Sequence, residues 1–276
     1  MKRLLVLLGL LLAFSTVLTG CGGDKKEGKE SSNEFRVGLE CAYAPFNWTQ
    51  TDDSNGAVPI KGGGYAGGYD VEIAKEIAKG LGKKLVIVKT EWDGLLPALT
   101  SGKIDAIIAG MSPTAERKES IDFTENYYKS ELVVVVKKDS KFASSTGLSD
   151  FAGAKITAQL NTFHYSVIDQ LTKVDKQTAM ESFPTMIVAL NSGKIDGYIS
   201  EKPGAVSAVA SNSNLSFVSF GEGKGFEASD DDVAVAVGLK KKSNLTEKIN
   251  EVLAGISQTD RDELMNSAVA NQPSAE

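Results

Sequence analysis

One cation and one anion stand at matching places in this sequence, each in the loop that follows one copy of a repeated segment. Arg117 carries a planar guanidinium that fits both oxygens of a carboxylate, and Ser112 and Thr114 in the same turn can add hydroxyl donors. Glu201 carries a carboxylate that can hold an ammonium group. The pair therefore suits a zwitterion bound between two lobes. Taken alone, Arg117 also fits an ordinary solvated face, because both of its neighbours are charged.

The repeated segments are Ala98–Asp105 (ALTSGKID) and Ala189–Asp196 (ALNSGKID). In both, the pattern predicts the end of a helix, a glycine where the chain leaves it, and the start of a short strand. An aromatic residue precedes each helix, Trp92 in the first and Phe183 in the second. The copies indicate two similar lobes, each of which aims one loop at a shared cleft. A helix, a terminal glycine and a strand can also recur by chance in an α/β protein.

Strands and helices alternate along the rest of the chain. Alternating or continuous apolar runs predict the strands, and apolar residues three or four apart predict the helices. Asp70 is the expected N-cap of the first helix. This order favours an α/β fold with largely parallel sheets flanked by helices. The expected strands are 35–39, 85–88, 104–108, 132–136, 155–159 and 233–239, and the expected helices are 71–81, 92–101, 161–171, 183–191 and 245–256.

The first 20 residues have the pattern of an export leader, which is set aside before the fold is considered. Two basic residues precede an apolar run, Leu4–Leu18, that is too short for a convincing membrane span. The run ends in LTGC, which resembles the lipobox of bacterial lipoproteins and implies cleavage before Cys21 and its acylation. The polar stretch 21–33 would be a flexible tether to the outer face of the bacterial cell membrane. An ordinary signal peptide followed by an unmodified cysteine is the alternative.

The composition excludes several classes of function. Without Lys2 and Arg3, the 30 basic residues fall to 28 against 36 acidic ones, so the net charge goes from −6 to −8. There is no basic tract, and nucleic acid is not an expected partner. Once Cys21 is acylated, Cys41 is the only thiol left, which excludes an internal disulfide and a cysteine metal site. His164 is the only histidine, so no multi-histidine metal site is expected. We interpret it as a surface or helix-start residue, with a catalytic base as the alternative.

Five groups of residues are informative through their order and spacing. They are Val37-Gly38-Leu39-Glu40 with Tyr43-Ala44-Pro45-Phe46, Gly68-Tyr69-Asp70-Val71, Trp92–Leu99, Gly110-Met111-Ser112 with Thr114 and Arg117, and Ile121-Asp122-Phe123-Thr124 with Tyr127-Tyr128. Together they resemble the solute-binding proteins of ABC-type importers for polar amino acids, over roughly residues 34–257. The resemblance implies a two-lobe fold of the periplasmic-binding-protein type II, with the ligand in the interlobe cleft. Lobe 1 would comprise 34–129 and 235–276, and lobe 2 would comprise 130–234.

The resemblance also implies how the backbone of an amino acid would be held. Arg117 would bind its carboxylate, assisted by Ser112 and by Thr162 from the second lobe. Glu201 would bind its ammonium group together with the Gly110 carbonyl.

Other residues would contact the ligand side chain. Glu40 would face it, and the rings of Tyr43 and Trp92 would lie on either side, although plain core packing is an alternative role for both rings. Gln159 stands where glutamine-binding relatives tend to carry Lys, and Leu160 and Phe163 also depart from the family's smaller or polar residues. The contacts of the second lobe are therefore the less certain part of the predicted site.

The charge of Glu40 indicates the class of ligand. A carboxylate between two aromatic faces, with no candidate cation near it in the sequence, favours a guanidinium, ammonium or imidazolium group. An acidic ligand would leave two carboxylates facing each other at substantial cost. We expect arginine first, then lysine, ornithine or histidine, delivered by a monomer to the permease and ATPase of an ABC importer without a cofactor.

Two other interpretations remain. Cyclohexadienyl dehydratases, which act on prephenate or arogenate, resemble these binding proteins, and Glu40 would be the acid or base of such an enzyme. The Gly62-x-Gly64-x-x-Gly67 stretch matches a dinucleotide-binding pattern, but the strand that should precede it is doubtful, and a mobile loop near the cleft is the better interpretation. We expect binding without catalysis.

Overall fold

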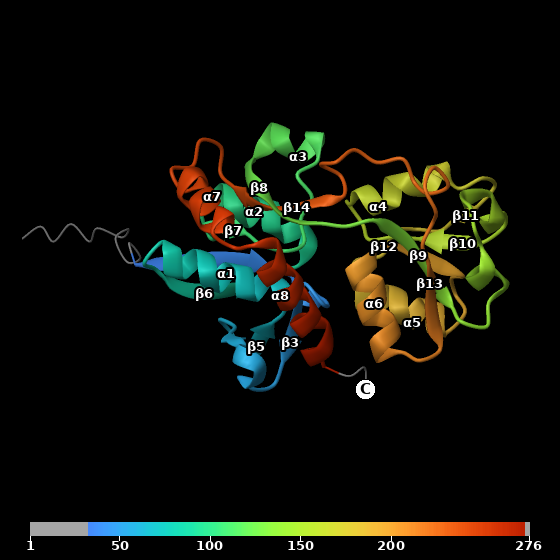
Figure 1. The fold of residues 1–276 in the computed structure, drawn as a ribbon, viewed down its shortest axis with the longest axis horizontal. Helices are drawn as coiled ribbons and strands as arrows, with labels where there is room; N and C mark the ends of the chain where they lie inside the picture. Colours follow the sequence, from blue (N-terminus) through green and yellow to red (C-terminus); the bar gives the residue numbers. More distant parts are fainter. Residues whose placement is uncertain (1–32, 274–276) are drawn as a thin grey trace, which may run out of the picture. The chain divides into compact units, whose positions relative to one another are not determined.

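Two five-stranded sheets of the same topology organise residues 33–273, which are the residues that this computed structural model describes. They belong to one compact unit of the chain, and Figure 1 shows the two sheets side by side within it. The expected leader (1–20), the expected lipidation site Cys21 and nearly all of the expected tether (21–33) lie outside the described residues.

Both sheets are mixed. In spatial order, the first sheet contains β6 (Lys84–Lys89), β1 (Glu34–Leu39), β7 (Ala106–Ile107), β14 (Ala234–Leu239) and β8 (Asp122–Lys129). The second contains β11 (Asp175–Lys176), β10 (Lys155–Thr157), β12 (Gly197–Glu201), β9 (Leu132–Lys137) and β13 (Leu215–Val218). In each, the first three strands are parallel, and the fourth is antiparallel to both neighbours.

The expectation of mostly parallel sheets is therefore corrected. Parallel neighbours need a crossover, usually a helix, and the first three strands of each sheet are joined in this way. The fourth strands, β9 and β14, enter instead from the two segments that link the sheets. Residues Val133–Val136 of β9 are completely buried, which explains why this antiparallel strand has the continuous apolar run typical of a parallel one.

The two copies of the repeat make the same hydrogen bonds. The N–H of Lys103 donates to the Ala98 carbonyl and that of Lys194 to the Ala189 carbonyl, both at 2.9 Å. The aspartate at the end of each copy accepts a hydrogen bond from a backbone N–H of a neighbouring strand. Asp105 accepts from Arg36 of β1 and Asp196 from Lys155 of β10, both at 2.8 Å. Each glycine has a positive φ, 83° at Gly102 and 74° at Gly193, as expected where a helix ends.

The repeat therefore has the same structural task in both halves. It ends a helix, pins the neighbouring strand through an aspartate, and leads into the central strand of its sheet, β7 or β12. The loops that follow β7 and β12 consequently leave the two sheets from equivalent positions.

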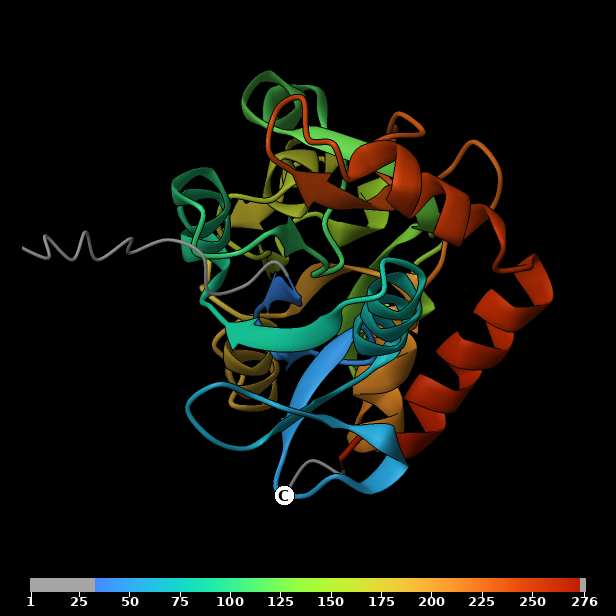
Figure 2. The ribbon, with the colours of Figure 1, turned by 90° about the vertical axis from the view of Figure 1, so that its left-hand side faces the viewer.

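Helices cover both sheets. Those around the first are α1 (Tyr69–Gly80), α2 (Trp92–Ser101), α3 (Ala115–Ser120), α7 (Thr246–Ala254) and α8 (Gln258–Asn271). Those around the second are α4 (Phe163–Ser166), α5 (Phe183–Asn191) and α6 (Lys202–Ser211). Figure 2 shows α7 and α8 in red along one flank, next to α1, and both of these helices contact α1. Short 3₁₀ turns occupy Ser54–Gly56, Lys141–Ser144, Leu148–Phe151 and Val167–Gln170.

A small antiparallel sheet connects β1 to α1. Its strands are β2 (Ala42–Tyr43), β3 (Asn47–Gln50), β5 (Tyr65–Gly67) and β4 (Val58–Pro59). The prediction that Asp70 is the N-cap of α1 is wrong. Asp70 is the second residue of the helix, and Gly68 is the N-cap. Gly68 has φ 121°, and a Cβ there would lie 2.3 Å from the Phe46 carbonyl oxygen, so no other residue fits. Asp70 is fully buried and accepts hydrogen bonds from Asn47 and Tyr127.

Two segments link the sheets, one between β8 and β9 and one between β13 and β14. They lie against each other, because the Ser130 N–H donates to the Val233 carbonyl at 2.9 Å. Lys129 also pairs with Asp230 at 2.6 Å. These contacts support lobe boundaries near 129/130 and 234/235, which remain a proposal.

Candidate functional site

The residues predicted for the site come from the ends of strands that meet between the two sheets. Glu40 and Tyr43 follow β1, Gly110 and Ser112 follow β7, and Trp92 begins α2. From the second half, Gln159 and Thr162 follow β10, and Glu201 is the last residue of β12. Ligands of open α/β sheets bind outside the carboxyl ends of parallel strands. The predicted residues thus lie where a ligand is expected.

A small enclosed cavity lies among these residues, with a free volume of about 10 Å³. It is lined by Tyr43, Trp92, Gly110, Ser112, Arg117, Gln159 and Thr162 of the predicted set, and also by Phe163 and His164. Glu40 and Glu201 do not line it but contact residues that do, and Thr114 lies outside it. A cavity of this size holds about one water molecule and is too small for an amino acid.

Arg117 spans the two halves of the molecule. One of its terminal nitrogens donates to the Ser112 carbonyl at 3.0 Å, and the other donates to the Asn161 carbonyl at 3.2 Å. Its guanidinium carbon lies 5.1 Å from the centre of the Trp92 ring, a favourable cation–π geometry. Burial lowers the pKa of Arg117 to about 10, so the group is charged at neutral pH. A backbone carbonyl of the second half thus occupies part of the guanidinium fork.

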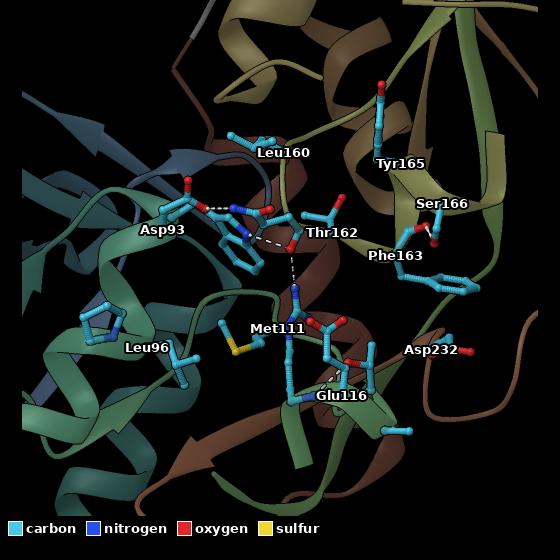
Figure 3. A pocket seen from close by; sticks show the side chains of 16 residues that line it. Asp93, Leu96, Met111, Glu116, Leu160, Thr162, Phe163, Tyr165, Ser166 and Asp232 are labelled. Carbon is cyan, nitrogen blue, oxygen red and sulfur yellow. Dashed lines mark hydrogen bonds between the residues drawn. The ribbon is translucent and has the colours of Figure 1, made fainter. Parts of the chain in front are cut away.

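A larger hollow of about 870 Å³ opens beside this cavity. In Figure 3, Leu96 and Met111 lie on one side of it, and Thr162, Phe163 and Tyr165 lie on the other. Thr114 also lines it, and its hydroxyl accepts the Arg117 N–H at 3.4 Å as the N-cap of α3. The Thr114 side chain therefore fixes the start of the helix that carries Arg117.

Glu201 is buried, with 1% of its surface exposed. The Tyr43 hydroxyl donates to its Oε2, and Nε2 of His164 lies 3.3 Å from its Oε1. The Tyr43 ring stacks on Phe183, with 4.1 Å between centroids and 9° between planes. Tyr43 therefore joins the first half of the molecule to both α5 and the end of β12.

Glu40 is buried as well, with 3% exposed. Its Oε2 accepts a hydrogen bond from Nε2 of Gln159 at 3.1 Å, and Gln159 also donates to the Glu181 carbonyl. The other oxygen, Oε1, is buried without any hydrogen-bond partner. A buried carboxylate with an unpaired oxygen is costly unless a further donor reaches it.

Burial shifts the pKa values of Glu40, Glu201 and His164. It raises the pKa of Glu40 to about 7, opposed by the Gln159 bond, and raises the pKa of Glu201 to about 8. It lowers the pKa of His164 to about 4, with a further contribution from the charge of Arg117. Around Glu40, the charges of Glu91 and Asp93 raise its pKa and that of Lys89 lowers it. Near pH 7 both carboxyl groups therefore bind more protons than an exposed carboxyl group does.

This predicts how stability depends on pH. Above pH 6.5 the unfolded carboxyl groups are ionised, while folded Glu40 and Glu201 still bind protons, so the free energy of unfolding falls as pH rises. We expect a decrease on the order of 2 kcal/mol between pH 6.5 and 8.5, measured by urea unfolding of ligand-free protein. The variants Glu40→Gln and Glu201→Gln should each flatten this slope. A free energy that rises over this range would contradict the assignment.

Three contacting residues were not predicted as site residues. His164 is a helix-start residue, as expected, but it is not on the surface: it is buried with 8% exposed. Asn161 adopts φ 54°, and its side chain donates to Asp93 at 2.9 Å. Phe183 stacks on Tyr43. The available signal was position alone: Asn161 and His164 lie one and two residues from Thr162, and Phe183 begins the helix of the second repeat.

Residues 35–267 match the model of the bacterial extracellular solute-binding proteins, family 3. The chain belongs to this family. Its fold is the type II periplasmic-binding-protein fold, α/β with two lobes. It is an amino acid ABC transporter substrate-binding protein, and the family and its relatives serve transport rather than catalysis. Among helices in residues 33–273, none has the length and apolarity that crossing a membrane requires.

Relatives of this solute-binding protein differ in their ligands. It is 28% identical to the arginine-binding extracellular protein ArtP of Bacillus subtilis, with 91% of each chain covered. It is 32% identical to a "probable histidine-binding protein" of Campylobacter jejuni, over 78% of this chain and 80% of that one. Among solved structures, AbpA of Streptococcus pneumoniae bound to L-arginine has a TM-score of 0.75 and 29% identity, with 86% and 95% covered.

Proposed function

We propose that this protein captures a free basic L-amino acid, arginine before lysine, ornithine or histidine, and delivers it unchanged to the permease of an ABC importer. The observation that carries the proposal is the buried Glu40 carboxylate with its unpaired Oε1. A guanidinium donates two parallel hydrogen bonds to one carboxylate, so it supplies the missing donor and the missing charge together.

The balance of charge supports a basic ligand. The site contains two buried acidic groups, Glu40 and Glu201, and one guanidinium, Arg117. Arginine brings the complementary set of one carboxylate and two cations. A neutral amino acid would leave Glu40 without a counter-ion, and an acidic one would add a second carboxylate beside it, which is costly in a buried site.

Each end of the ligand backbone has a proposed partner. Arg117 binds the carboxylate, assisted by Ser112 and Thr162, and the carboxylate takes the place of the Asn161 carbonyl in the guanidinium fork. Glu201 binds the ammonium group, with the Gly110 carbonyl as a second acceptor. The Thr162 hydroxyl now donates to the Gln159 carbonyl at 2.7 Å and exchanges this bond for one to the ligand.

The ligand side chain extends toward Glu40 and Gln159 between Tyr43 and Trp92. Both rings have partners in the structure: Phe183 stacks on Tyr43, and the guanidinium of Arg117 lies over Trp92. A ligand guanidinium can replace the second contact with one of the same kind, because a cation over an aromatic face is favourable from either source.

Closure of the lobes follows from this division of contacts. In the structure, groups of the two halves bond to each other: Tyr43 with Glu201, Gln159 with Glu40, and Arg117 with the Asn161 carbonyl. A bound amino acid exchanges these direct bonds for bonds through itself and so favours the closed state. The closed state presents the surface that the permease recognises, while a lipid on Cys21 keeps this monomer at the outer face of the membrane.

Calorimetric titration with a panel of amino acids tests this proposal. The protein from residue 22 onward is unfolded, dialysed to remove any co-purified ligand and refolded. We expect 1:1 binding of arginine at least tenfold tighter than of glutamine, cystine or glutamate, with mass spectrometry recovering the amino acid unchanged. Preferential binding of a neutral or acidic amino acid would refute the basic ligand, and turnover of prephenate or arogenate would refute a binding role.

A further inference from the structure

His164 has a place in the site that neither the charge balance nor the family resemblance assigns. It is the second residue of α4, it lines the small cavity, and it is buried with 8% exposed. Its ring packs edge-to-face with that of Phe183, with 6.4 Å between the ring centroids and 84° between the ring planes. Its Nε2 lies 3.3 Å from Oε1 of Glu201, whereas its Nδ1 is buried without a hydrogen-bond partner.

The surroundings of His164 keep it neutral. Burial is the largest cause, and the positive charge of Arg117 adds to it by disfavouring a second cation, so the pKa of His164 is lowered to about 4. A neutral imidazole with its proton on Nε2 presents an N–H 3.3 Å from Oε1 of Glu201 and adds no positive charge to the ammonium subsite. A lysine or arginine in the same place would form an ion pair and compete with the ligand for the carboxylate.

Both carboxyl oxygens of Glu201 therefore have a polar neighbour. Tyr43 donates to Oε2 from the first half of the molecule, and His164 reaches Oε1 from the second. Because Tyr43 belongs to the other half, its contact is lost when the cleft opens. His164 and Glu201 lie on neighbouring elements of the same half, since α4 contacts β12, so their contact persists in the open state.

We infer that His164 is a positioning residue of the ammonium subsite: it orients the Glu201 carboxylate in the open protein so that the α-ammonium group of an amino acid binds to a preformed acceptor. This inference rests on the proposed role of Glu201 and deepens the proposed function, but it does not depend on which amino acid is bound. Preorganised acceptors bind more tightly because the ligand does not have to order them.

The test compares arginine with 5-guanidinopentanoate, which lacks only the α-ammonium group. In His164→Phe, which keeps a ring against Phe183 but has no nitrogen, we expect about tenfold weaker binding of arginine. Binding of the desamino compound should stay within about twofold of the unaltered protein. His164→Gln, whose amide N–H can reach the position of Nε2, should restore most of the affinity for arginine.

Equal losses for both compounds would overturn the inference, because a merely structural role of His164 would weaken every ligand alike. A second measurement is His164→Phe in a Glu201→Gln background. We expect no further loss of arginine affinity there, and a full additional tenfold loss would also overturn the inference. If the panel identifies another amino acid as the ligand, the basic-ligand proposal fails, and His164 is tested with that amino acid and its desamino form.

Discussion

Replacement of Arg117 by alanine is expected to weaken arginine binding about 1,000-fold, or about 4 kcal/mol. Within its own half of the molecule, the guanidinium bonds to the Ser112 carbonyl and lies over the Trp92 ring, and these contacts set its orientation. Its removal leaves the ligand carboxylate buried without a counter-ion, which costs more than the loss of an exposed pair. The dissociation constant from calorimetry checks this expectation.

Two control variants separate the effect of the planar guanidinium of Arg117 from the effect of its positive charge. Arg117→Lys keeps the charge but lacks the planar pair of donors, and its loss should be intermediate, about 30-fold. Lys79→Ala removes one positive charge from α1, where the side chain is 80% exposed, and should leave the affinity within about twofold. If Arg117→Ala still binds arginine with full affinity, the ligand carboxylate is held elsewhere and the proposed orientation is wrong.

The frame of the site could be predicted from the sequence because it depends on local patterns. Both copies of the repeat end their helices at the expected glycines, and the helices from Trp92 and Phe183 begin as expected. These features follow from backbone geometry within one turn, and near neighbours along the chain determine it. The matching hydrogen bonds of Asp105 and Asp196 explain why the repeat marks equivalent positions in two sheets.

Several elements could not be predicted because their sequences lack a clear period. The helix α8 is mostly polar and buries only Met265 and Ala268, so its place depends on contacts with α1 and α6. The strand β8 pairs with β14 through an irregular register, which hides its alternation. The expected helix 161–171 divides into α4 and a 3₁₀ turn, a distinction that apolar spacing does not contain.

The contacts within the site lie beyond the reach of local patterns. Tyr43 and Glu201 are 158 residues apart and Glu40 and Gln159 are 119 apart, and no spacing rule brings such residues together. The resemblance to a family supplied the residues, and the structure supplied their present partners. Asp70 shows that a local pattern can also give a wrong prediction. An acidic residue near a helix start favours an N-cap, but burial beside Tyr127 gives it another task.

Glu40→Gln is expected to change which amino acid the protein prefers. The amide is nearly isosteric with the carboxylate and can still bond to Gln159, so the shape of the site is kept while its charge is removed. We expect arginine binding to weaken about 100-fold, or about 3 kcal/mol, because its guanidinium is then buried without a counter-ion. Glutamine binding should change less than threefold, since a neutral side chain gains nothing from the carboxylate. Titration of both amino acids against the variant measures the two changes.

The matched control is Glu91→Gln, which removes the same charge from an exposed neighbour whose field acts on Glu40. It should alter arginine affinity less than threefold, because exposed charges are screened by water and salt. Equal losses of arginine and glutamine in Glu40→Gln would show that Glu40 supports the structure and does not select the ligand. A selective loss of arginine would locate the choice of ligand in one buried carboxylate, whereas Arg117 and Glu201 recognise the groups that every amino acid shares.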